Sequence, residues 1–63
     1  MLELMIEHWH NLDGSDQYLW SVWRDGKRIV MSRPTASSAD AEQQGLAWCQ
    51  RSAGQPPDRL TKL

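Results

Sequence analysis

The stretch YLWSVWRDGKRIVMSR, from Tyr18 to Arg33, decides the fold because it predicts two short strands joined at Asp25-Gly26. An Asp-Gly pair flanked by alternating large side chains is a strong short-range signal for a β-hairpin, since a type I′ turn needs positive φ at both central residues. A two-residue turn also fixes which residues lie opposite one another on the two strands. We therefore expect an antiparallel hairpin of defined register in the middle of the chain.

This register divides the hairpin side chains between two faces of a sheet, because directly opposed residues point to the same side. The face expected to form the core holds Tyr18, Trp20, Val22, Ile29 and Met31. The opposite face is expected to hold Leu19, Ser21, Trp23, Arg28, Val30 and Ser32. On this second face Trp23 lies opposite Arg28, and an indole beneath a guanidinium is the geometry of a surface cation–π pair.

The segment over residues 2–10 alternates along its length, with Leu4 and Ile6 on one side and Trp9 on the other. Such alternation predicts a strand with one buried face. A tight Asp-Gly turn in the loop that follows, residues 11–17, would turn the Trp9 side inward. We expect the aliphatic side to be buried instead, with a looser or bulged loop that pairs this strand antiparallel with the next.

A helix is predicted after the hairpin, from about Ala39 to Arg51 or Ala53, with Ser37 or Ser38 as its N-cap and Gly54 just beyond its end. Ser37 with Asp40 fits a capping box in its acidic variant, and Ser38 is the adjacent alternative cap. Glycine is a typical residue just beyond the end of a helix. The helix has one broad apolar arc, which must lie on the sheet.

Gly45 stands in the middle of that arc, where it lowers helix propensity by about 1 kcal/mol relative to alanine. We interpret it as a close approach to a bulky residue such as Trp20. The expected fold is α+β, a three-stranded antiparallel meander with one C-terminal helix packed on one face. Residues 1–54 form this single domain, and residues 55–63 form an extended tail that is disordered in isolation or docks along an edge strand.

The bulk composition narrows the function classes. A chain of 63 residues with net charge −1 makes one small domain with no overall attraction to phosphate or anionic membranes. Its one cysteine excludes an internal disulfide, and the N-terminal residues resemble neither a secretory signal nor a membrane span. We expect a soluble cytoplasmic protein. No phosphate loop, nucleophile elbow or paired carboxylates are present, so we expect no enzyme activity and no cofactor.

His8 and His10 are the sharpest candidates for chemistry, because two imidazoles on one side of a strand can chelate zinc or nickel. A metal site needs a third and usually a fourth ligand. Cys49, Asp13 and Asp16 are available, but none stands at the spacing of a known motif. Cys49 as a nucleophile is disfavoured too, since a cysteine in the apolar arc of a helix usually acts as a small hydrophobe. We expect neither a metal site nor a catalytic residue.

The face opposite the core offers a stronger hypothesis. It is expected to expose an apolar patch, and such patches usually mark binding surfaces. The interaction residues predicted there are Trp9, Trp23, Arg28 and Val30. The partner is expected to be a second copy of the chain, giving a homodimer, or another protein. The alternative is that the C-terminal tail from Pro56 to Leu63, or a slipped first strand, covers the patch.

A second hypothesis is nucleic-acid contact through the same hairpin, which is locally basic. The contact residues would be Arg24, Lys27, Arg28 and Arg33. With Trp23 they resemble the reading surface of the three-stranded DNA-binding domains of the AP2 and integrase amino-terminal type. That resemblance implies a sheet laid into the major groove. The net charge of −1 speaks against it, because such domains carry a basic excess.

From the hairpin turn onward the chain also resembles the small bacterial modules of the YegP type, over residues 17–53. Three features carry the resemblance: Gly26-Lys27-Arg28-Ile29, Ser32, and the run from Ser38 to Leu46. In that run Gly45 follows Ser38 by seven residues, in the middle of the helix. Glu42 stands where that family has a small residue, and Ala36 lies near the place of a usual aromatic. The resemblance implies a compact antiparallel sheet with one helix, often in tandem duplicate and without assigned catalytic activity. Because this chain holds a single copy of the module, a homodimer could take the place of the tandem pair.

Overall fold

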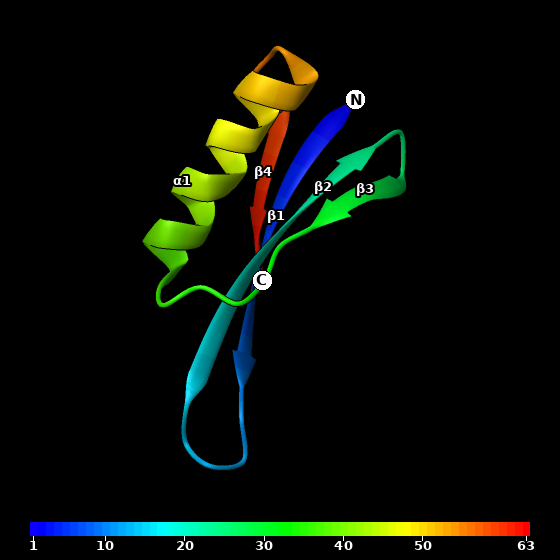
Figure 1. Cartoon of the computed structure of the whole chain (residues 1–63). Coiled ribbons are helices and arrows are strands. Elements are labelled where there is room, and N and C mark those ends of the chain that lie inside the picture. The colour runs from blue at the N-terminus through cyan, green and yellow to red at the C-terminus, as the bar shows by residue number, and fades with distance from the viewer.

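The computed structural model describes the whole chain, residues 1–63, as a four-stranded mixed sheet with one helical segment on one side (Figure 1). The elements in chain order are β1 (Leu2–His10), β2 (Asp16–Arg24), β3 (Lys27–Met31), α1 (Ser38–Trp48), the π-helical turn η1 (Cys49–Ala53) and β4 (Arg59–Lys62). The strand order is β3-β2-β1-β4. The class is α+β as predicted, and the three antiparallel strands are present, but the sheet is not a three-stranded meander.

The difference lies in the C-terminal tail, which forms β4 parallel to β1. The Asp58 backbone N–H donates to the Leu2 carbonyl over 2.7 Å, and its carboxylate accepts from the Leu2 N–H over 2.8 Å. At the other end the Leu63 N–H donates to the Ile6 carbonyl over 2.9 Å. Residues 58–63 are therefore part of the sheet. Of the two alternatives for the tail, docking along an edge strand is the one that forms, and it adds a fourth, parallel strand that the predicted three-stranded meander lacks.

The first strand buries its aliphatic side, as predicted. Leu2, Leu4 and Ile6 are almost fully buried, whereas Trp9 on the other side is 54% exposed. β1 pairs with β2 so that Leu4 lies opposite Val22, and a five-residue loop over residues 11–15 separates the two strands. The loop is looser than a two-residue Asp-Gly turn, and this keeps the aliphatic side of β1 in the core.

The β2–β3 hairpin has the predicted turn but a different register beyond it. Asp25 and Gly26 have φ values of 50° and 83°, as a type I′ turn requires. Trp23 pairs with Arg28 as expected, but a bulge follows, and Val22 then pairs with Val30. A bulge places one extra residue, here Ile29, on one strand and reverses the facing of every residue beyond it.

Because of the bulge, the faces predicted for Ile29, Val30 and Met31 of β3 are wrong. Val30 packs against the core, whereas Met31 moves to the opposite face. Ile29 is 46% exposed and Met31 40% exposed, so neither belongs to the core. The pattern could not reveal this, because residues 29–31 are three apolar side chains in a row.

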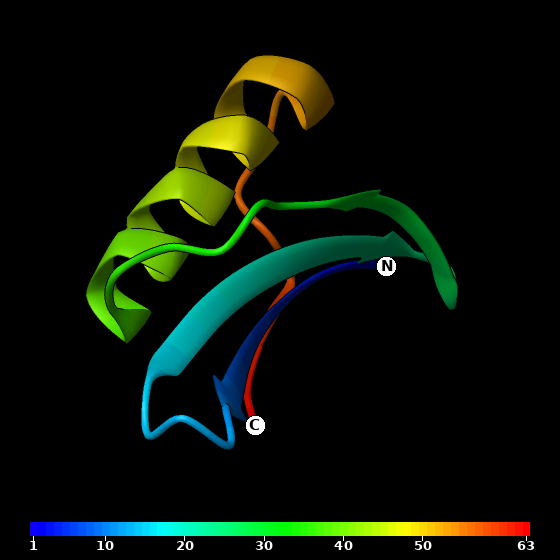
Figure 2. The same cartoon turned by 60° about the horizontal axis from the view of Figure 1, so that its bottom comes forward.

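The helix begins at the predicted cap, since the Ser37 hydroxyl accepts from the Asp40 N–H over 3.1 Å. Its last turn widens into η1, and Gly54 ends it in the left-handed conformation with φ 72°. Figure 2 shows α1 on one side of the sheet, with no helix on the other. The core between the two layers consists of Leu2, Leu4, Ile6, Trp20, Val22, Ala41 and Cys49.

Gly45 is buried where α1 comes closest to the sheet, but the residue it meets is Leu4 rather than Trp20. A Cβ built on Gly45 would overlap Leu4 Cδ1 and lie 3.0 Å from Cδ2 and 3.2 Å from Cγ. Leu4 is fully buried, so its side chain has little freedom to move aside. Glycine at this position lets the helix lie close to β1.

Replacing Gly45 with alanine is expected to destabilise the protein by up to about 2 kcal/mol, because overpacking typically costs about 1–3 kcal/mol and the better helix propensity returns about 1. Urea unfolding followed by tryptophan fluorescence measures the change. In a Leu4→Val background, where the side chain is one carbon shorter and its methyl groups are drawn back from the helix, Gly45→Ala should become neutral or stabilising. An equal loss in both backgrounds would contradict the Leu4 contact.

Candidate functional site

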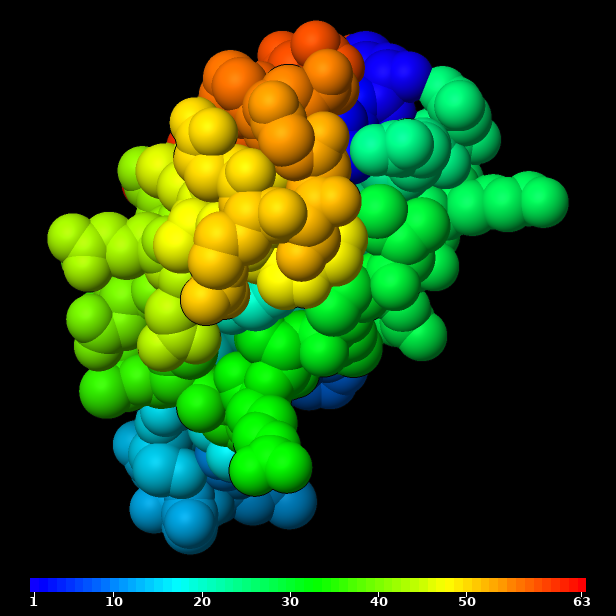
Figure 3. All heavy atoms as spheres, turned by 45° about the horizontal axis from the view of Figure 1, so that its top comes forward, coloured from blue at the N-terminus to red at the C-terminus, as the bar shows by residue number.

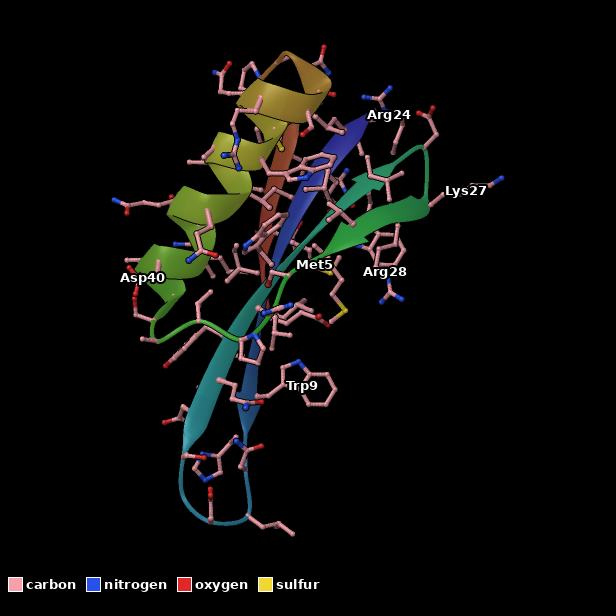
Figure 4. The ribbon with its side chains drawn as sticks, in the orientation of Figure 1. Met5, Trp9, Arg24, Lys27, Arg28 and Asp40 are labelled. Carbon is pink, nitrogen blue, oxygen red and sulfur yellow. The ribbon has the colours of Figure 1, made fainter.

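The side of the sheet away from α1 is the candidate site. Figure 4 shows Met5, Trp9 and Arg28 pointing to this side, away from the helix. We call it the bare face. By strand alternation and register it consists of Glu3, Met5, Glu7 and Trp9 of β1, Gln17, Leu19, Ser21 and Trp23 of β2, Arg28 and Met31 of β3, and Arg59 and Thr61 of β4.

The centre of the bare face is apolar and is built around Ser21. Met5 and Met31 lie opposite Ser21 on the two neighbouring strands. The Trp23 indole N–H donates to the Ser21 hydroxyl over 2.9 Å. These neighbours leave Ser21 only 1% exposed although no helix covers it. The centre therefore presents methionine and indole surface to solvent, with no unpaired buried polar side chain beneath it.

The charged side chains at the edge of this centre differ in their pairing. Glu3 accepts from the Thr61 hydroxyl over 2.7 Å and lies 3.8 Å from the Arg59 guanidinium. Glu7 and Arg28, in contrast, form no ion pair in the structure. Figure 4 shows Arg28 extending from β3 on the open side. The bare face thus carries one uncompensated negative charge and one uncompensated positive charge.

The predicted interaction residues do not all share this face. Trp9, Trp23 and Arg28 lie on it, but the bulge puts Val30 on the core side. Sequence reasoning missed Met31, which occupies the place expected for Val30. The predicted Trp23–Arg28 cation–π pair is also not formed, since the Arg28 guanidinium contacts Met31 Sδ at 3.5 Å and the indole is bonded to Ser21.

The four predicted nucleic-acid contacts are dispersed. Arg24 and Lys27 lie opposite each other beside the hairpin turn, and Figure 4 shows Lys27 extending away from the molecule. By alternation they point to the side opposite Arg28. Arg33 is exposed in the segment after β3. The structure does not bring these side chains together on one surface.

A shallow hollow lies at the end of the molecule where the N terminus meets the β2–β3 turn and the Gly54–Asp58 segment (Figure 3). Its two carboxylates are already paired. The Met1 ammonium group binds the Asp25 carboxylate, and this contact lowers the Asp25 pKa. The Asp58 carboxylate holds the Leu2 N–H. The hollow therefore belongs to the structural connection of β4 and the hairpin turn to β1.

The histidines form a cluster at the far end of the β1–β2 hairpin. His8 Nε2 and His10 Nδ1 each lie 2.9 Å from the same Asp16 oxygen, and the His8 ring stacks on Tyr18 at 4.6 Å. Asp13, another ligand candidate, is bonded to Ser15 instead. The structure contains no group of three or more His, Cys, Asp or Glu side chains arranged to hold a metal ion.

Cys49, the remaining candidate, lies far from this cluster on the buried side of the helical segment. It is fully buried in the core, and burial raises the pKa of its thiol. A buried thiol with a raised pKa is a poor nucleophile and a poor metal ligand, because both roles need the thiolate. The environment of Cys49 is that of a core residue.

Acid is expected to destabilise the protein partly through Asp16. Hydrogen bonds from His10 and then His8 lower the Asp16 pKa below its usual value of 3.8. A carboxylate whose pKa is lowered by folding contributes stability above its unfolded pKa and loses it as pH falls through the folded pKa. The free energy of unfolding should therefore fall below about pH 4, and the fall should be shallower in Asp16→Asn. Urea titrations at several pH values test this, and parallel curves for the two proteins would refute the role of Asp16.

Neither helical segment is long and apolar enough to cross a membrane. The comparisons with known proteins found no match, since no family model, curated protein or solved structure is significantly similar to the chain.

Proposed function

We propose that the chain is a small non-enzymatic interaction module that forms a homodimer through the bare face. The observation that carries the proposal is an apolar centre, made by Met5, Leu19, Trp23 and Met31, on a sheet face that no other element covers. Exposed apolar patches of this kind usually mark interaction sites. Tryptophan, methionine and arginine are also the side chains enriched at the centres of interfaces.

Charge favours a second copy of the chain as the partner. A symmetric dimer uses the same patch on both subunits, so the patch must be complementary to itself. Glu7 and Arg28 meet this condition, because they are opposite charges on one face without an intramolecular ion pair. Each charge can find its counter-charge on an identical subunit.

Sedimentation equilibrium tests the proposal. The parent chain should show a concentration-dependent monomer–dimer equilibrium between micromolar and millimolar concentrations. The variant Trp23→Ala/Arg28→Glu should be monomeric over this range, with circular dichroism checking that it is folded. The matched control Arg24→Ala/Lys27→Ala changes two residues at the hairpin turn and should dimerise like the parent. A parent chain that stays monomeric throughout would overturn the proposal.

DNA binding is the competing outcome, and the same sheet face gives it less support. Arg28 shares the bare face with Glu3 and Glu7, and the net charge is −1. Phosphate binding draws its affinity from basic side chains that displace counterions. A mobility-shift assay at low salt should show no complex with duplex DNA. A salt-sensitive complex that weakens in Arg28→Ala would replace the dimer proposal with a nucleic-acid one.

A further inference from the structure

The arrangement of side chains around Ser21 has an approximate symmetry. Along β2, Trp23 and Leu19 lie two residues to either side of Ser21. Across the sheet, Met31 and Met5 lie opposite it on β3 and β1. The diagonal positions are filled by Arg28, which pairs with Trp23, and Glu7, which pairs with Leu19. The apolar side chains around this centre, and the two charges without an ion pair, thus each have a counterpart on the opposite side, whereas Glu3, beside Trp23 on β1, is already paired with Arg59.

We propose that two copies of the chain pack with their bare faces together about a twofold axis that passes over Ser21, so that Glu7 of each subunit binds the partner's Arg28. This inference rests on the proposed homodimer and specifies its geometry. In such a dimer Ser21 lies beneath the axis and faces the partner's Ser21. Its hydroxyl is already bonded to Trp23, so it brings no unpaired polar group into the interface.

The spacing of a β-sheet shows that the remaining contacts fit the same axis. Strands lie about 4.8 Å apart and residues rise about 3.3 Å along a strand. The axis that exchanges Glu7 with the partner's Arg28 brings Met5 over the partner's Trp23 and Leu19 over the partner's Met31. Methionine sulfur against an aromatic ring is a favourable contact. One symmetry operation therefore satisfies the charged pair and the apolar pairs together.

The same axis makes the strands of the two subunits cross at roughly 70°, by the strand spacings used above. Twisted sheets pack face to face either nearly aligned or nearly perpendicular, and this crossing belongs to the second class. Figure 2 shows that the strands are strongly bent and twisted along their length. A large crossing angle suits such a twisted sheet, because two saddle-shaped surfaces make closer contact when one is rotated by a large angle relative to the other.

Charge reversal tests the geometry with size-exclusion chromatography and native mass spectrometry. Glu7→Arg alone and Arg28→Glu alone each place like charges together at both contacts, so each should raise the dimer dissociation constant by at least about tenfold. An equimolar mixture of the two variants should form a heterodimer, because both contacts are then complementary. The double variant Glu7→Arg/Arg28→Glu should recover the homodimer.

The control Arg24→Glu reverses the same kind of charge at the hairpin turn and should leave dimerisation unchanged. If the parent dimerises but the single variants dimerise equally well, or their mixture gives no heterodimer, the Glu7–Arg28 contact is wrong and the homodimer proposal stands. If the parent does not dimerise, the proposed function itself fails. The two failures are therefore distinguishable.

Discussion

Removal of residues 58–63 is expected to lower the free energy of unfolding by about 3 kcal/mol, because at least three hydrogen bonds worth about 1 kcal/mol each are lost with β4. These are the bonds of Asp58 to Leu2, one in each direction, and of Leu63 to Ile6. Small domains have a total stability of about 0.05–0.15 kcal/mol per residue, or about 3–9 kcal/mol for 63 residues. The truncated chain should therefore keep at most about 6 kcal/mol of stability and should be aggregation-prone, since β1 becomes an open edge.

A matched control separates backbone pairing from the ion pairs of β4. Arg59→Ala/Lys62→Ala removes the contacts to Glu3 and Glu42 but keeps the strand. Exposed ion pairs are worth about 0–1 kcal/mol, so this variant should stay close to the parent. Urea unfolding of the three proteins measures the difference. A truncated chain with the parent's unfolding midpoint would show that β4 does not stabilise the sheet.

Replacing Trp20 with alanine is expected to destabilise the protein by about 3–5 kcal/mol, the usual cost of deleting a buried tryptophan. Trp20 is 7% exposed and joins the two layers. Its ring lies 6.3 Å from that of Trp48, and its indole N–H donates to the Gln44 side chain over 3.3 Å. The variant should lose its near-ultraviolet circular dichroism and most of its cooperative unfolding.

Trp9→Ala is the comparison for Trp20, because it deletes the same side chain from the bare face. Trp9 is 54% exposed, and surface substitutions usually change stability by no more than about 0.5 kcal/mol. Chemical denaturation should therefore rank the two variants far apart. Equal losses from both would mean that the two tryptophans are not divided between a core face and a bare face.

The features that could be predicted from the sequence are those set by neighbouring residues. The Asp25-Gly26 turn, the Ser37 cap and the Gly54 stop each depend on the preference of one or two residues for a particular backbone conformation. The buried side of β1 followed from its alternation. Each of these predictions is confirmed.

The features that could not be predicted depend on distant pairing. β4 is four residues long, and the pair Asp58 and Leu2 is separated by 56 positions in the chain. No local pattern marks such a parallel pairing. The bulge at Ile29 was hidden for a related reason, since three consecutive apolar residues fit either face and only tertiary packing selects Val30 for the core. As a result, Met31 rather than Val30 lies on the bare face.

The methionine methyl groups provide the most direct test of self-association through the bare face. The chain has three methionines, so a sample labelled with carbon-13 at the methionine methyls gives three signals. Raising the protein concentration should shift the signals of Met5 and Met31 and leave that of Met1, which lies outside the centre of the face, unchanged. The Met5 shift should disappear in Trp23→Ala. Constant Met5 and Met31 signals from micromolar to millimolar concentration would contradict the account.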